Sequence, residues 1–401
     1  MAKEKIKAFL NSRKVQAVGF TVLCVLLPVA FLLQMFHKSF SPNGNDFTIF
    51  LMAAKDFLAG LNPYKAATPF PYVYPLFVTF VLVPFTLLPY WLACLLWYLI
   101  KLALYYLIVK LLVEMGKGQI KAGFDRTIFF PLAVFSLLFL NAIQSDLRSG
   151  HVETFVLAAC MLFAKYYWEK KYLISALFLS AAISIKVVPG ILLLYLLMKK
   201  DFKTIFLCAL IVPVYCVALP YVFSGPEIFG HYRYWINSFV LGNVDWATRL
   251  YKEDFCDLHS VILYYLPGLT SVGYLKHLSM LLVFFVLAFI DGVLCKKRNC
   301  ENELVLVMLY LAAILLIAPI FQIHYLMFIF PGAAFIVLKV FFDKEWQNTE
   351  ILAAIVAFFA CLILGKIVKH GPFYFFSIAV LMYLLTRALT GSTGKLQKKK
   401  R

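Results

Sequence analysis

The chain has 401 residues, of which 63% are hydrophobic and 14% are charged, and its mean hydropathy is +0.86. This composition excludes a soluble globular protein and predicts a polytopic membrane protein. The formal net charge of +18 excludes little by itself, because the basic residues form short clusters beside apolar stretches, at 110–126, 170–171, 199–203, 296–298 and 395–401. Such clusters mark cytoplasmic loops and contact anionic membrane lipids, and we expect no nucleic-acid partner.

The first spanning helix is predicted at residues 16–36, behind a basic start at 1–15. About 20 apolar residues cross a hydrocarbon core of roughly 30 Å. No small-residue cleavage site follows this run, so we expect an uncleaved helix with a cytoplasmic N-terminus.

Residues 37–75 are predicted to form the first outer loop, with an amphipathic helix that lies in the membrane interface. Asp46 opens this helix, and Gly60 ends it before Pro63. Thr48, Lys55 and Asp56 are expected to face water. The apolar residues that recur at helical spacing are Phe47, Phe50, Leu51, Ala54 and Leu58.

The central part of the chain contains two departures from simple alternation of spans. Residues 76–113 are too long for one upright helix and contain Pro84 and Pro89, so they form two helices or one with an interfacial extension. Spans are expected near 128–143 and 151–168, around a short outer loop at 144–150. Residues 173–198 begin and end beside basic clusters, which predicts a hairpin or a broken helix at 185–190.

Further spans are expected near 203–223, 273–295, 303–322, 325–342, 350–367 and 372–389. The fold class is therefore an all-α polytopic integral membrane protein of about twelve crossings, forming one transmembrane domain over 1–401. Its basic tail at 390–401 is expected in the cytoplasm. We expect the inner (plasma) membrane of a bacterium. The large outer loop at 224–257 is either solvated or a cover for an acceptor pocket; its charged candidates are Arg233, Asp245, Arg249 and Asp257.

Three motifs stand in order along the chain. Asp46 is followed by Gly60-Leu61-Asn62-Pro63-Tyr64 and Tyr74-Pro75; the helix from Leu177 ends in a Lys-x-x-Pro element at Lys186; and the segment from Ala318 to His324 contains a proline and a histidine. These motifs resemble those of glycosyltransferase family 87. The resemblance implies a type-C glycosyltransferase bundle that takes a sugar, with mannose favoured, from a polyprenyl-phosphate donor on the outer leaflet. One departure bears on the acceptor and the sugar: Ser149 to Glu153 stand where the family often has a Gly-Gln pair.

Transfer from a lipid phosphate needs a base for the acceptor hydroxyl and cations for the departing phosphate. Asp46 is the candidate base, since it lies on the side opposite the basic clusters. Its alternative role is to stabilise its own helix by capping and by the helix dipole. A single base without a second nucleophile favours direct displacement with inversion.

Lys186, His324 and Arg148 are the candidates for binding the donor phosphate. An ionisable group inside an apolar run, such as Lys186, indicates a functional site, although snorkelling to the interface is the alternative. A histidine satisfied at the interface is the alternative for His324. The sugar or the acceptor is assigned to Tyr64, Asp146, His151 and Glu153, with solvated loop residues as the alternative for the last three.

No carboxylate spacing typical of a divalent metal site is present, so we expect no metal and no cofactor. Two other classes of protein stay open. A transporter or lipid flippase also has broken helices and charges at membrane depth, but it commonly shows paired repeats, which this chain lacks. In a non-catalytic membrane scaffold, Asp46 and Lys186 would be exchangeable without loss.

Overall fold

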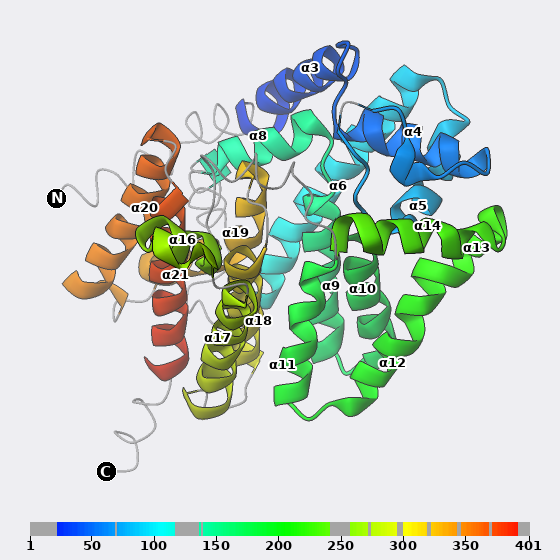
Figure 1. Ribbon diagram of the computed structural model, residues 1–401. Coiled ribbons are helices and arrows are strands. Elements are labelled where there is room, and N and C mark those ends of the chain that lie inside the picture. Colours follow the sequence, from blue (N-terminus) through cyan, green and yellow to red (C-terminus); the bar gives the residue numbers. More distant parts are fainter. Residues whose placement is uncertain are drawn as a thin grey trace.

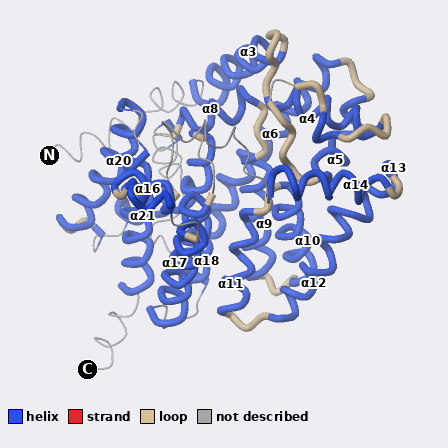
Figure 2. The backbone as a smooth tube through the Cα atoms, in the orientation of Figure 1, coloured by secondary structure: helices blue, strands red, loops and turns tan. Residues whose placement is uncertain are grey.

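The computed structural model describes residues 22–68, 70–116, 136–137, 139–240, 257–271, 274–294, 300–318, 322–342, 346–368 and 371–391. These residues form helices joined by short loops, without a strand among them (Figures 1 and 2). Six of the described helical stretches are long and apolar enough to cross a membrane: 90–115, 202–224, 275–293, 323–340, 349–368 and 372–390. The all-α polytopic class is confirmed, whereas the number of about twelve crossings stays a prediction.

The N-terminal elements are η1 (Val22–Leu26), α3 (Leu27–Ser39) and α4 (Asp46–Leu58). Asn45 caps α4: its side chain accepts a hydrogen bond from Thr48 N at 3.1 Å, and Thr48 Oγ1 accepts one from Asn45 N at 3.1 Å. Asp46 is therefore the first residue inside the helix and not its cap. After α4, Gly60 takes a φ of +72°, as its predicted role at the end of the helix requires.

The amphipathic pattern of α4 is confirmed with one correction. Phe47, Phe50, Leu51 and Ala54 are buried as expected, but Leu58 is 38% exposed, and Phe57 takes its place in the core. The buried face of α4 therefore ends at Phe57, one residue earlier than predicted, because the helix itself ends at Leu58. The 3-10 turn η2 (Pro63–Lys65) follows.

Residues 76–113 form two helices, α5 (Leu76–Thr86) and α6 (Tyr90–Gly116), which separate just before Pro89. This settles the choice between two helices and one extended helix. Helix α5 packs against α4, and α6 packs against α9.

The predicted outer loop at 144–150 is wrong. Residues up to Ser149 belong to α8 (Leu140–Ser149), and α9 (Glu153–Trp168) follows after a bend of 114°. The polar residues of α8 suggested a loop, but Ala142, Ile143 and Leu147 form a buried helical face. Only residues 150–152 link the two helices.

The predicted break near Lys186 is confirmed. Helix α10 (Tyr172–Ile185) ends at Lys186, whose backbone is extended, and η3 (Val188–Ile191) leads into α11 (Leu192–Met198). Figure 1 shows α3 and α8 at the top of the molecule, with α9 to α12 below them.

The later elements complete the bundle and are α12 (Phe202–Pro213), η4 (Val214–Ala218), α13 (Leu219–Ser224), α14 (Glu227–Trp235), η5 (Ile236–Val240), α16 (Leu258–Tyr265), η6 (Pro267–Ser271), α17 (Leu275–Phe289), η7 (Ile290–Leu294), α18 (Cys300–Ile317), η8 (Ile323–Ile329), α19 (Phe330–Phe342), α20 (Thr349–Val368) and α21 (Gly371–Gly391). The predicted outer segment 224–257 contains α14, on which Arg233 is exposed. Asp257 is buried and caps α16 by accepting a hydrogen bond from Ser260 N at 2.9 Å. Asp245, Arg249, the N-terminal segment 1–15 and residues 392–401 of the basic tail lie outside the described residues.

Candidate active site

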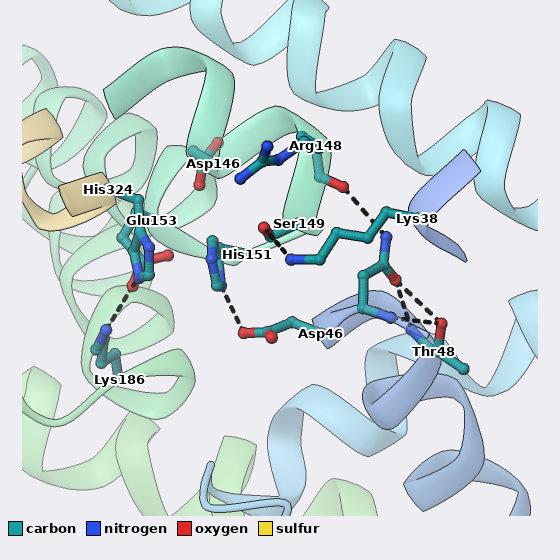
Figure 3. Close-up of polar contacts among 12 residues, drawn as sticks. Lys38, Asp46, Thr48, Asp146, Arg148, Ser149, His151, Glu153, Lys186 and His324 are labelled. Carbon is teal, nitrogen blue, oxygen red and sulfur yellow. Dashed lines mark hydrogen bonds and ion pairs between the residues drawn. The ribbon is translucent and has the colours of Figure 1, made fainter. Parts of the chain in front are cut away.

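Polar side chains from four separate segments meet at the corner between α8 and α9 (Figure 3). Asp46 comes from the start of α4, Lys186 from the break after α10, and His324 from η8. His151 and Glu153 come from one segment, the link and the first residue of α9. All five are candidates predicted from the sequence. The fold therefore collects residues that are up to 278 positions apart in the chain.

Asp46 and His151 form a pair, with His151 Nδ1 2.5 Å from Asp46 Oδ2. The His151 side chain is 7% exposed and the Asp46 side chain is 31% exposed. Burial raises the pKa of Asp46, but the charge and the hydrogen bond of His151 outweigh it, so this pKa lies below its ordinary value. Asp46 is thus held as a partly exposed carboxylate next to a buried histidine.

Glu153 contacts Lys186 and His324 at the corner. Its Oε1 lies 2.5 Å from Lys186 Nζ and 3.5 Å from His324 Nε2, and the Glu153 side chain is fully buried. The rings of His324 and His151 stack with centroids 3.5 Å apart. The Lys186 ammonium also lies 3.7 Å from the centroid of the Tyr325 ring. Lys186, predicted as a cation for the donor phosphate, therefore already has a carboxylate partner.

Lys101 on α6 is a central residue of the site that the sequence analysis missed. Its Nζ lies 2.8 Å from Asp146 Oδ2, and both side chains are fully buried. The same ammonium donates to the carbonyl oxygens of Asp146 and His151, at 2.5 Å and 2.7 Å. All three of its donors are used, which favours a structural role for Asp146 over its predicted contact with the sugar. Lys101 carries the same signal as Lys186, a charge inside an apolar run.

The link between α8 and α9 fits closely against α4. Gly150 has a φ of +72°, and a Cβ atom built on it would lie 2.7 Å from Phe47 Cβ. Trp97 of α6 donates its Nε1–H to the Gly150 carbonyl at 3.1 Å. Because Phe47 directly follows Asp46, this contact places the carboxylate beside His151.

The remaining candidates lie apart from the corner or at its edge. Tyr64 is buried among aromatic rings, with its ring centroid 5.5 Å from that of Tyr72 and 6.4 Å from that of Trp235. Its hydroxyl has no hydrogen-bond partner in the described part of the chain. Arg148 is exposed in the last turn of α8, three residues before His151.

His151, Glu153 and His324 place one potential metal-ligand atom each within 4.8 Å of one another. Two imidazoles and a carboxylate are typical ligands of transition metals. Here, however, the Lys186 ammonium contacts the same carboxylate and supplies a positive charge. The expectation that the chemistry needs no metal stays a prediction, and a chelator tests it.

Comparison with known proteins gives a match to a protein family. The sequence model of glycosyltransferase family 87 matches residues 72–321, which is more than half of the chain. The matched range contains His151, Glu153 and Lys186, begins after Asp46 and ends just before His324. No curated protein and no solved structure matches the chain.

Proposed function

Because this chain belongs to glycosyltransferase family 87, we propose that it transfers a hexose, with mannose favoured, from a polyprenyl-phosphate-sugar donor to a lipid or glycan acceptor. We place the reaction on the extracytoplasmic face, with both termini in the cytoplasm. The family and the apolar helices make the chain an integral membrane glycosyltransferase. The family match also favours an enzyme over a transporter or a scaffold.

The observation that carries the proposal is the state of Asp46. Among the described carboxylates at the corner it has the most exposed side chain, 31% against 0% for both Asp146 and Glu153. The two buried carboxylates are each neutralised by a lysine, whereas Asp46 contacts a histidine and remains partly accessible to solvent. A base for an incoming hydroxyl needs this combination of charge and access.

In the proposed reaction, Asp46 accepts the proton of the acceptor hydroxyl while the acceptor oxygen bonds to the anomeric carbon of the sugar. The bond between that carbon and the phosphate oxygen breaks, and the electron pair leaves with the polyprenyl phosphate. One displacement inverts the anomeric centre. His151 is proposed to orient Asp46 and to keep it ionised, through the bond between Nδ1 and Oδ2.

The other candidates are proposed to have two different roles. His324 stacks on the His151 ring and positions it, and Lys186 is linked to His324 through Glu153, which both of them contact. Arg148, which is exposed, is proposed to contact the donor phosphate directly.

The test is sugar transfer from radiolabelled polyprenyl-phosphate-mannose in membranes that contain the wild type or Asp46→Asn at equal protein level. The loss of a general base lowers the rate by typically 10² to 10⁴, so we expect a loss of about that size. Asp56→Asn is the matched control, since it removes a carboxylate from the other end of α4. Equal transfer by wild type and Asp46→Asn would remove Asp46 from the mechanism.

A further inference from the structure

A hollow of about 530 Å³ lies beside the candidate active site, between α3 and α8. Gln144 of α8 donates to Gln34 Oε1 of α3 at 2.7 Å and ties the two helices together at its edge. The residues that line the hollow are Leu33, Gln34, His37, Lys38, Ser41 and Arg148. It therefore combines two cationic side chains with apolar and neutral polar ones.

Lys38 and Arg148 are the cations of this hollow, and neither forms an ion pair with a carboxylate in the described part of the chain. Lys38 Nζ donates to the hydroxyl oxygen of Ser149 at 2.8 Å, which holds the ammonium at the last residue of α8 (Figure 3). Burial lowers the pKa of Lys38, the nearby charge of Arg148 lowers it further, and the charge of Asp46 raises it in part. Two close like charges, neither of them paired directly with a carboxylate in the described part of the chain, favour the binding of an anion.

The contrast with the buried lysines is direct. Lys101 and Lys186 each contact a fully buried carboxylate, at 2.8 Å and 2.5 Å, so their charges are balanced within the protein. A phosphate that approached them would have to displace those partners, at the cost of leaving a carboxylate buried and unpaired.

An apolar surface leads from the hollow along α3 to the last residue of η1. Leu26, Val29 and Leu33 are 57%, 51% and 66% exposed, and they recur at the helical spacing that places them on one face. Leu33 belongs both to this face and to the hollow. The cationic hollow and the adjoining apolar face together match a molecule with a terminal phosphate and an apolar chain.

We propose that Lys38 and Arg148 bind the phosphate of the polyprenyl-phosphate donor, and that the exposed face of α3 receives the first part of its apolar chain. This assignment rests on the proposed function and replaces Lys186 as the cation that contacts the leaving group. The site adjoins the base: Asn45 Nδ2 donates to the Arg148 carbonyl at 3.3 Å, and Asn45 directly precedes Asp46. A donor phosphate held there places the anomeric carbon between Asp46 and the two cations.

The test measures binding and kinetics separately. Polyprenyl phosphate is added to the purified protein in detergent, with polyprenol as the phosphate-free probe, and the thermal midpoint is compared with the unliganded midpoint of the same variant. We expect polyprenyl phosphate, but not polyprenol, to raise the midpoint of the wild type and of Lys55→Met, an exposed lysine of α4. Lys38→Met and Arg148→Gln should lose this increase.

In transfer assays, Lys38→Met and Arg148→Gln should raise KM for the donor by about tenfold or more, the usual effect of losing a hydrogen bond to a charged group. KM for the acceptor should stay unchanged. A midpoint increase retained by both variants, or a rise in KM for the acceptor alone, would overturn the assignment. The proposed function would survive either outcome, because it depends on whether the wild type transfers the sugar and Asp46→Asn does not.

Discussion

Gly150→Ala tests whether the close contact between the α8–α9 link and α4 sets the position of Asp46, the proposed base. The new Cβ would lie 2.7 Å from Phe47 Cβ, 3.2 Å from Phe47 N and 3.4 Å from Phe47 Cα. Two of these three atoms belong to the backbone, so the strain cannot be relieved by a side-chain rotation. Phe47 and Asp46 must move away from the link by several tenths of an ångström.

Two costs add for this substitution. A left-handed backbone costs a residue other than glycine roughly 1–2 kcal/mol, and overpacking costs typically 1–3 kcal/mol, so we expect a loss of about 2–5 kcal/mol in the free energy of unfolding. A misplacement of about 1 Å lowers enzymatic rates by roughly 10², so sugar transfer should fall at least about tenfold.

Gly60→Ala is the matched control. Gly60 also has a φ of +72°, but a Cβ atom there would meet nothing within 4 Å. It carries the backbone cost of roughly 1–2 kcal/mol without the clash. The assays are the thermal midpoint in detergent and transfer from radiolabelled polyprenyl-phosphate-mannose. If Gly150→Ala and Gly60→Ala lose equal stability and equal activity, the contact with Phe47 does not position Asp46.

Three further predictions concern the charges of the corner. His151→Leu removes the charge and the hydrogen bond that do most to lower the pKa of Asp46, and it leaves the burial that raises this pKa. The acidic limb of the profile of kcat/KM against pH should therefore move to higher pH, and it should move less in His151→Asn, which retains a donor. An unchanged limb in both variants would refute the pairing. Glu153→Gln leaves Lys186 without its carboxylate partner and should lower the free energy of unfolding by about 3–5 kcal/mol. The double variant Glu153→Gln/Lys186→Met should lose less than Glu153→Gln alone. If the losses of the two single variants simply add in thermal unfolding, the two residues do not act as a pair. Transfer should withstand chelators, and complete loss with rescue by Mn²⁺ would assign a metal to the site that includes His324.

Much of the fold was predictable from the sequence because local signals dominate it. The helix from Asp46, its end at Gly60 and the break near Lys186 each follow from spacing, glycine or proline chemistry within a few residues. The α8 helix was not predicted, since its polar residues outnumber the apolar ones, and only packing against α3 and η8 shows which face is buried.

The candidate site was predictable in its members but not in their pairing. Asp46, His151, Glu153, Lys186 and His324 were all named from the sequence, and they meet in space. The sequence does not reveal which cation neutralises which carboxylate, because that depends on contacts between distant helices. For this reason Lys186 was assigned to the substrate phosphate, although it contacts Glu153.

The cap of α4 separates the folding of this helix from its chemistry. Asn45 and Thr48 satisfy the first backbone groups of the helix, so the carboxylate at position 46 has no capping hydrogen bond to provide. An amide at that position should leave the helix, and the surfaces around it, in place. Asp46→Asn is therefore suited to trapping donor and acceptor together without turnover, and a structure of that ternary complex would reveal which sugar and which acceptor the enzyme selects.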